Sequence, residues 1–353
     1  MVTPDKRLIL NKYPLKELFV EITDKCNLLC KHCSTEAGPT GEQQLNFKKI
    51  VEIIDEAYNL GVRYFCISGG EPLLHPDVFE MIEYAKKRGM KKVTLYSCGY
   101  ITGNLQKNKT LLERLASSKL DRIIFSLHSS DPMIHDQITG IKGSYEFAIK
   151  AIQYAVTKKM KVEVHCVPMS YNFKTIPSLL RLCEKLGVEQ LSLLRLVKQG
   201  RCMDNPDLVM SKRQLNVFRE IINKLKNGNY KTRLRLGAPF NCLFLDRYTK
   251  CTAALCKILI SADGSLFPCE AFKTSARPAP NIYKMSLFEY WSKDPLLWKL
   301  REDRQKITKA CKDCESLEKC RGGCPGQRYL IDKNFTKKDP LCYWKVNGVE
   351  KVV

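Results

Sequence analysis

The pattern of hydrophobic and polar positions switches repeatedly between two periods from Lys16 to about Leu236. Short runs rich in Val, Ile, Leu and Phe predict buried strands, and amphipathic stretches with apolar residues three and four positions apart predict helices. The apolar runs are continuous, which is typical of strands covered on both faces of a parallel sheet. The predicted strands are Leu18–Ile22, Tyr64–Ser68, Lys92–Ser97, Arg122–Leu127, Val162–Val167 and Leu191–Leu196.

Helices with recognisable ends lie between these strands. Asn46 can cap a helix whose apolar face includes Ile50 and Ile54 and which ends at Gly61. Alternating strands and helices favour an α/β fold with a parallel sheet and right-handed crossovers. Six such units predict a partial (β/α)6 barrel over residues 17–236. The other predicted helices are Asp77–Arg88 before Gly89, Ser144–Lys158, Ile176–Leu186 before Gly187, and Ser211–Lys226.

The alternation stops after Leu236, and the rest of the chain is rich in cysteine and in loops. Ile258–Ile260 and Leu266–Pro268 flank an Ala-Asp-Gly-Ser turn and predict a hairpin. One further helix is predicted over Leu287–Arg301. Because this region has little apolar pattern, we expect metal ligation to stabilise it. The predicted division is an N-terminal extension (1–16), the barrel (17–236) and a cysteine-rich domain (237–353).

Lys and Arg number 59 against 37 Asp and Glu, a formal net charge of +22. Such an excess attracts acidic partners, but the basic residues are scattered in clusters such as Lys86-Lys87-Arg88, so nucleic acid is not the expected partner. No apolar stretch reaches the roughly 18 residues that a membrane span needs, and the N-terminus lacks a signal-type apolar core. The sequence therefore predicts a cytoplasmic protein without a membrane partner.

The chain contains 17 cysteines, which in a reducing compartment indicates metal ligation rather than disulfides. Eleven of them fall into tight patterns. The remaining six are expected to be small buried apolar side chains. These are Cys66, Cys98, Cys166, Cys183, Cys202 and Cys242.

The first pattern is Cys26-Asn-Leu-Leu-Cys30-Lys-His-Cys33, directly after the first predicted strand. Three thiolates on one loop can hold three irons of a 4Fe–4S cluster and leave the fourth iron open, because a full cluster usually takes four cysteines. The alternative, a zinc site, needs a fourth ligand. His32 stands between two of the cysteines and has no room to share their metal.

This pattern, together with Ile67-Ser68-Gly69-Gly70-Glu71-Pro72 at the end of the second strand, resembles the radical S-adenosylmethionine (SAM) superfamily. The resemblance implies that the open iron chelates SAM, which is cleaved to a 5′-deoxyadenosyl radical. It also implies SAM contacts by Gly69, Gly70, Glu71 and Ser126, and we add His32 to the cofactor-binding set. The chain departs from the family at His128, where many relatives have Asp, and at Thr139 (after His135-Asp136), which replaces an Arg that can meet the SAM carboxylate.

Eight further cysteines follow in the C-terminal region and resemble the SPASM extension of that superfamily. The alternative is structural zinc, since Cys-x-x-Cys pairs suit it. The resemblance implies two auxiliary 4Fe–4S clusters, which makes three clusters in all. By analogy the first auxiliary cluster takes Cys251, Cys256, Cys269 and Cys324, and the second takes Cys311, Cys314, Cys320 and Cys342.

SPASM enzymes mostly modify peptides or proteins, so the leading hypothesis is oxidative crosslinking of a ribosomally made peptide, with a one-electron donor such as flavodoxin or ferredoxin. The alternatives are a sulfatase-type formylglycine maturase, a peptide epimerase and a small-molecule dehydrogenase. Few residues precede the barrel, so a leader peptide, plausibly acidic, is expected to bind the barrel or a separate protein. Glu270, after Cys269, is the candidate catalytic base, with a carboxyl pKa raised by low dielectric. Cys98 and Cys166, at strand ends, could face the pocket; an epimerase would use one to return hydrogen.

Overall fold

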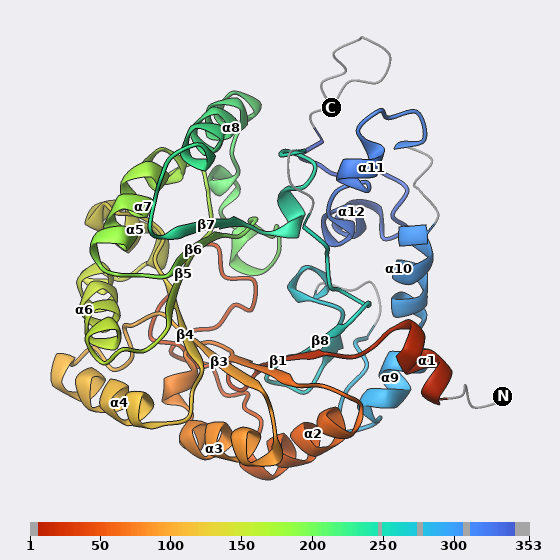
Figure 1. Cartoon of the computed structure of the whole chain (residues 1–353), viewed down its shortest axis with the longest axis horizontal. Helices are drawn as coiled ribbons and strands as arrows, with labels where there is room; N and C mark the ends of the chain where they lie inside the picture. Colours follow the sequence, from red (N-terminus) through yellow and green to blue (C-terminus); the bar gives the residue numbers. More distant parts are fainter. Residues whose placement is uncertain (1–5, 246–248, 274–277, 306–310, 343–353) are drawn as a thin grey trace.

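The computed structural model describes residues 6–245, 249–273, 278–305 and 311–342. One curved sheet forms the centre of the molecule, and helices cover its outer face (Figure 1). The strand order is β7-β6-β5-β4-β3-β2-β1-β8-β9, with all neighbours parallel except β8 and β9. The strands are β1 (Glu17–Glu21), β2 (Tyr64–Ser68), β3 (Lys92–Ser97), β4 (Arg122–Ser126), β5 (Val162–Cys166), β6 (Gln190–Leu193), β7 (Arg233–Leu236), β8 (Lys257–Ile260) and β9 (Leu266–Phe267).

All six predicted strands form, within a residue or three of their predicted ends, and the α/β partial barrel is confirmed. The sheet is larger than predicted, however, because β7 extends it beyond β6 and β8 pairs in parallel with β1. The sequence Arg-Leu-Arg-Leu of β7 alternates polar and apolar residues, so it lacks the continuous apolar run of the other strands. The predicted hairpin is β8–β9, and it continues the barrel sheet rather than standing apart.

The barrel helices follow the predicted punctuation. The Asn46 side chain accepts a hydrogen bond from the Lys49 amide at 2.9 Å, and Gly89 ends α3 with a φ of 107°. Helices α4 and α5 are additional to the predicted set. The barrel helices are α2 (Phe47–Asn59), α3 (Val78–Arg88), α4 (Leu105–Ser117), α5 (Pro132–Thr139), α6 (Ser144–Thr157), α7 (Ile176–Lys185) and α8 (Lys212–Lys226).

The helix predicted over Leu287–Arg301 is two helices, because Pro295 has no N–H and prevents the residue before it from being helical. Asp294 has an extended conformation there, and its carboxylate caps the second helix by accepting from the amides of Leu296 (2.9 Å) and Leu297 (3.1 Å). The remaining helices are α1 (Lys6–Lys12), α9 (Leu287–Lys293), α10 (Pro295–Gln305), α11 (Leu317–Cys320) and α12 (Pro325–Asp332). Short 3₁₀ helices span Pro72–Leu74, Phe173–Thr175, Gly200–Cys202, Pro206–Leu208, Ala238–Phe240 and Glu270–Phe272.

A buried ion pair joins the barrel to the C-terminal region. Arg195, after β6, donates to both carboxylate oxygens of Asp339 at 2.7 Å each. Apolar residues of the barrel and of α9 and α10 belong to one continuous core. Among the described residues, no helix is long and apolar enough to cross a membrane.

Candidate functional site

The three cysteines of the first pattern lie on the loop that leaves the carboxyl end of β1. The Cys26 amide donates to the Gly38 carbonyl at 2.9 Å, and other amides of the loop donate to the last turn of α5. Burial raises the pKa of the Cys30 thiol well above its usual range, and the nearby charges of Cys33 and Cys26 raise it further. The loop therefore holds three neighbouring thiols at the carboxyl end of the barrel.

Gly69 and Gly70 allow the end of β2 to touch this loop. A Cβ atom on Gly69 would lie 2.3 Å from the Thr23 carbonyl oxygen, and one on Gly70 would lie 2.2 Å from that of Lys25. Both obstacles are backbone atoms, so no side chain could move aside. The amide of Gly70 donates to the Thr23 carbonyl at 2.7 Å. These two positions require glycine because of close backbone approach.

Glu71 is completely buried beside the same loop. Its carboxylate accepts hydrogen bonds from the Ser97 hydroxyl (3.0 Å), the Cys98 amide (2.8 Å) and the Leu73 amide (3.2 Å). Burial raises the pKa of this carboxyl, although these hydrogen bonds oppose the shift. Glu71 thus ties the carboxyl ends of β2 and β3 together next to the cysteine loop.

Two of the single cysteines differ in their surroundings. The Cys98 thiol donates to Cys26, which lowers the pKa of Cys26, so Cys98 belongs to the surroundings of the first cysteine group. Cys166 is completely buried and packs in the main core together with Val162 and Val164. The expectation that Cys166 could face the pocket is therefore wrong, because its position on β5 points towards the helices.

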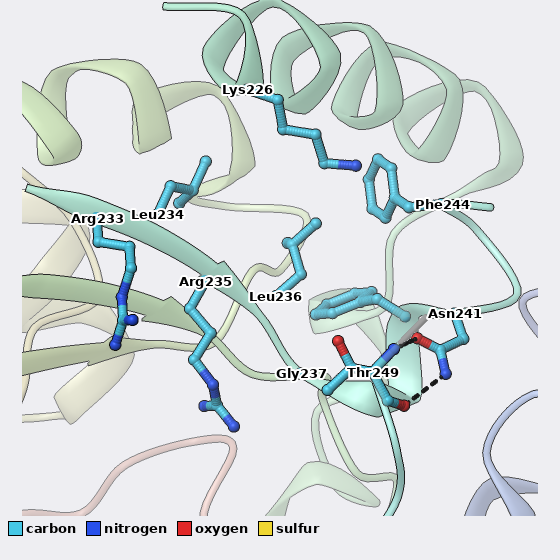
Figure 2. A pocket seen from close by; sticks show the side chains of 10 residues that line it. Lys226, Arg233, Leu234, Arg235, Leu236, Gly237, Asn241, Phe244 and Thr249 are labelled. Carbon is cyan, nitrogen blue, oxygen red and sulfur yellow. Dashed lines mark hydrogen bonds between the residues drawn. The ribbon is translucent and has the colours of Figure 1, made fainter. Parts of the chain in front are cut away.

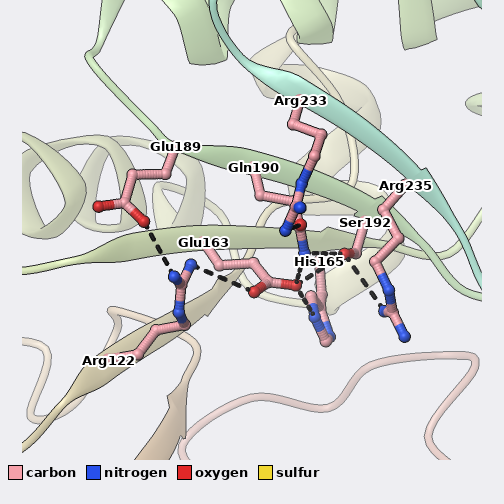
Figure 3. Close-up of polar contacts among 8 residues, drawn as sticks. All are labelled: Arg122, Glu163, His165, Glu189, Gln190, Ser192, Arg233 and Arg235. Carbon is pink, nitrogen blue, oxygen red and sulfur yellow. Dashed lines mark hydrogen bonds and ion pairs between the residues drawn. The ribbon is translucent and has the colours of Figure 1, made fainter.

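Ser126 ends β4 and faces His165 of β5 in the sheet register. Glu163 and His165 alternate along β5 with the core residues, so they face the inside of the barrel. A network of side chains from β4, β5 and β6 surrounds Glu163 there (Figure 3). Its carboxylate accepts from His165 Nε2 (2.8 Å), Gln190 Nε2 (2.6 Å) and Ser192 Oγ (2.7 Å), and Arg122 lies at 3.5 Å.

This network strongly favours the ionised form of Glu163. Burial by itself raises the pKa of the carboxyl, but the hydrogen bonds and charge of His165, together with Ser192 and Gln190, outweigh it and lower the pKa to about 2. Arg233 and Arg235 of β7 extend the wall and are exposed. The inside of the barrel is thus polar and rich in cationic donors beside Ser126.

Glu270, the candidate base, follows Cys269 and forms an ion pair with Lys257 of β8 at 2.9 Å. Burial raises the pKa of the Glu270 carboxyl, but the charge and hydrogen bond of Lys257 outweigh it, so the pKa is lowered. The expectation of a raised pKa is therefore wrong. Low dielectric acts as supposed, but a buried lysine across the hairpin neutralises the carboxylate.

The cysteines before and after α10 gather around Cys251. Burial raises the pKa of the Cys269 thiol well above its usual range, and Glu270, Cys251 and Cys324 raise it further. Cys251 likewise raises the pKa of Cys256, after burial and Glu17. The structure thus brings together a first set of thiols on three separate segments: Cys251, Cys256, Cys269 and Cys324.

The other C-terminal cysteines gather separately. Burial raises the pKa of the Cys320 thiol to about 12, with further contributions from Asp339, Cys342 and Cys311. The amide of Cys314 donates to the Cys311 carbonyl at 3.1 Å, so these two share one turn. Within the described ranges, no three His, Cys, Asp or Glu side chains converge on one point as the ligands of a single metal ion would.

A cavity of about 380 Å³ opens beside the first thiol set. Cys251, Cys320 and Cys324 line it together with Arg301 and Arg304 of α10. Arg301 Nη2 is buried there and has no hydrogen-bond partner among the described residues. Thiols and a buried cation without an anion are a suitable lining for an anionic iron–sulfur cluster, which carries about −2 when four thiolates bind it.

A second cavity, of about 290 Å³, lies between β7 and α8 (Figure 2). The Asn241 side chain closes one end of it through hydrogen bonds with the Thr249 backbone at 2.8 and 3.1 Å. The ammonium of Lys226 lies 4.4 Å from the centre of the Phe244 ring. None of the described residues that line this cavity is among the site residues predicted from the sequence.

Comparison with known proteins agrees with both thiol-rich regions. The model of the radical SAM superfamily matches residues 20–183, and that of the SPASM iron–sulfur cluster-binding domain matches residues 251–315. The chain belongs to the radical SAM superfamily and carries a SPASM domain. It is therefore a radical SAM enzyme, and SAM and iron–sulfur clusters are its cofactors.

Relatives of known name cover nearly the whole chain. It is 25% identical to an AdoMet-dependent heme synthase of Nitratidesulfovibrio vulgaris, over 92% of this chain and 91% of that protein. It is 26% identical to a PqqA peptide cyclase of Granulibacter bethesdensis, over 93% of this chain and 87% of that protein. Among solved structures, SuiB of Streptococcus suis with S-adenosylmethionine has a TM-score of 0.76 at 20% identity, covering 95% of this chain and 80% of SuiB.

The structure adds Arg201 to the surroundings of the radical SAM cysteine loop. Arg201 donates from Nε to the Cys30 carbonyl (2.9 Å) and from Nη2 to the Ala37 carbonyl (2.7 Å). Its charge also lowers the pKa of Cys26, as a smaller effect than the Cys98 hydrogen bond. No local signal in the sequence could have found Arg201, because 171 residues separate it from Cys30.

Three histidines lie in a row beside this loop. The ring centres of His32 and His128 are 4.4 Å apart, and those of His128 and His135 are 5.9 Å apart. Burial lowers the pKa of His32 and His135 to about 4 each, so both rings are neutral at physiological pH. Thr139, in the position of the family's arginine, is buried, and its hydroxyl lies 2.6 Å from that of Ser144.

Proposed function

We propose that this enzyme oxidatively modifies a ribosomally made peptide by forming a crosslink. The observation that carries the proposal is the position of the two thiol-rich regions relative to the barrel interior. The Cys26 loop lies at the carboxyl end of β1, and Cys269 follows β9 of the same sheet. A substrate inside the barrel would therefore lie between a site that generates a radical and a site that can accept an electron.

Side chains inside the barrel connect these two regions. The ring of His165, beside Ser126, is centred 5.3 Å from that of Tyr96, which is 5.2 Å from that of Phe19. The ammonium of Lys257, the partner of Glu270, lies 4.5 Å from the Phe19 ring. This wall runs from the proposed SAM contact to the residue that follows Cys269.

In this proposal Cys26, Cys30 and Cys33 hold the cluster that binds SAM, and the two C-terminal thiol sets hold auxiliary clusters. SAM on its cluster supplies a 5′-deoxyadenosyl radical, which removes a hydrogen atom from the substrate. Gly69, Gly70, Glu71, Ser126 and His32 remain the proposed SAM contacts. Glu270 accepts a proton from the substrate as it is oxidised, and an external flavodoxin or ferredoxin supplies the first electron. The peptide cyclase relative supports a peptide substrate.

A small molecule with carboxylates is the second candidate substrate. Arg233 and Arg235 are exposed on β7, and the structure places no carboxylate within ion-pair distance of either among the described residues. The relative that is named as a heme synthase also shows that this combination of domains is used with a small-molecule product. Sulfatase-type maturation and epimerisation are supported by the shared fold alone.

The test is to incubate the anaerobically reconstituted enzyme with SAM, dithionite and the short peptide encoded beside its gene, in deuterium oxide. A loss of about two mass units from the peptide is expected, because two hydrogens leave when a crosslink forms. A gain of about one unit, abolished by Cys98→Ala, would instead show epimerisation. If no short peptide raises 5′-deoxyadenosine formation but a porphyrin carboxylate does, the second candidate is correct.

Glu270→Gln tests the proposed base, because the amide keeps the shape of the carboxylate and removes its basicity. We expect product formation to fall at least tenfold while the iron content is unchanged. Asp263→Asn is a matched control, since Asp263 lies in the β8–β9 turn of the same hairpin. Product formation at the unmodified rate in Glu270→Gln would exclude the base role.

A further inference from the structure

Arg301 and Arg304 stand one helical turn apart on α10 and line the cavity that also contains Cys251 and Cys324. The sequence offers no reason to select them among so many basic residues. They differ from the scattered surface lysines because Arg301 is only 1% exposed and Arg304 is half-buried.

Arg301 is a buried cation without an anion. Nε donates to the Ala254 carbonyl and Nη1 to the Trp291 carbonyl, each at 2.9 Å. The guanidinium carbon lies 4.3 Å from the ring centre of Tyr13 and 4.5 Å from that of Trp291. Among the described residues, no carboxylate lies within ion-pair distance, and Nη2 is buried without a hydrogen-bond partner. An uncompensated buried charge is costly, so this arrangement points to an anion in the cavity.

Arg304 shows where that anion is held. Its Nη2 donates to the Cys251 sulfur at 3.0 Å, and its Nη1 donates to the Cys251 carbonyl at 3.1 Å. Its Nε is also buried without a hydrogen-bond partner among the described residues. Both arginines therefore direct unused donors into the space beside the first thiol set.

We propose that Arg301 and Arg304 are positioning residues for the auxiliary cluster held by Cys251 and Cys324, and that they raise its reduction potential. Reduction by one electron changes a four-thiolate cluster from about −2 to about −3, and two fixed cations stabilise the added charge. In the titration below, dithionite supplies the electron. In catalysis, the carbon radical of the substrate supplies it and is thereby oxidised.

The two arginines make the first auxiliary site a better electron acceptor than its thiolates alone would be. This step rests on the proposed oxidative function only in naming the donor during catalysis. The potential itself is a property of the protein without substrate, so it can be measured independently. Failure of the peptide experiment and failure of this proposal are therefore distinguishable.

The test uses protein in which Cys26, Cys30 and Cys33 are replaced by Ala, so that only auxiliary clusters remain. An anaerobic redox titration with dithionite, followed by electron paramagnetic resonance, gives their potentials. Arg301→Met and Arg304→Gln should each make reduction about tenfold less favourable, which corresponds to about 59 mV for one electron. Each should also lose iron to a chelator severalfold faster.

Arg301→Lys is the conservative variant, which keeps the charge and should recover most of the potential. Arg321→Gln is the matched control, because Arg321 lines the same cavity but is exposed, so solvent screens its charge. If Arg301→Met does not fold, Arg304→Gln at its half-buried position provides the measurement. The proposal is overturned if both potentials match the Arg321→Gln value, or if Arg301→Lys shifts the potential as far as Arg301→Met.

Discussion

Asp339→Asn should destabilise the junction between the barrel and the SPASM domain. Arg195 donates two charge-assisted hydrogen bonds to the Asp339 carboxylate at 2.7 Å, and the two side chains are only 5% and 1% exposed. The same carboxylate accepts from the amides of Cys324 (2.7 Å) and Leu341 (2.8 Å). Asn keeps the size of the side chain but removes its charge and presents an N–H₂ group to one of these donors.

The expected loss is large, because removing one partner of a buried pair leaves the other charge uncompensated. Such changes cost about 3–5 kcal/mol in the free energy of unfolding. The unfolding of a two-domain metalloprotein is not two-state, so we would follow it by pulse proteolysis in urea and by iron content. Since Asp339 positions Cys324, the variant should also lose iron from the auxiliary sites.

Glu189→Gln is the matched control, because Glu189 forms an ion pair at 2.9 Å with Arg122 but is 47% exposed. Exposed pairs contribute about 0–1 kcal/mol, so this variant should be nearly neutral. A double variant, Arg195→Met with Asp339→Leu, should recover most of the loss, because it removes both buried charges. The reasoning is refuted if Asp339→Asn changes protease resistance no more than Glu189→Gln does.

Three further predictions follow from the barrel. The pKa of Glu163 is lowered to about 2, so its network stabilises the fold fully above pH 4.3 and loses that contribution as the pH falls towards 2; Glu163→Gln should remove about 3 kcal/mol of this pH dependence, measured by acid unfolding. Gly70→Ala should abolish 5′-deoxyadenosine formation, because its Cβ would lie 2.2 Å from the Lys25 carbonyl oxygen, whereas Gly38→Ala meets only a movable leucine methyl at 3.3 Å and should stay active. Reconstituted enzyme should bind about 12 iron, and removing the three thiols of the first loop should remove about 4 and abolish SAM cleavage, an outcome checked by iron assay and chromatography. The variant for this last test replaces Cys26, Cys30 and Cys33 by Ala.

Local pattern in the sequence was sufficient for most of the barrel and for the choice of cysteines. Each predicted strand or helix depends on a periodicity that a few neighbouring residues contain, so β1 to β6 and the helices between them could be located. The spacing of Cys26, Cys30 and Cys33 and the pair Gly69-Gly70 are equally local. The close approach of Gly70 to Lys25 explains why that motif is readable, since only glycine fits there.

Only the tertiary structure decided what lies beside these elements. The pairing of β8 with β1, the bonds of Arg201 to the Cys30 loop and the grouping of Cys324 with Cys251 all join residues far apart in the chain. The pKa of Glu270 had the wrong predicted direction for the same reason, because Lys257 reaches it across the hairpin. Periodicity and spacing carry information over a few residues, whereas charge and coordination depend on distances in space that the folded chain alone sets.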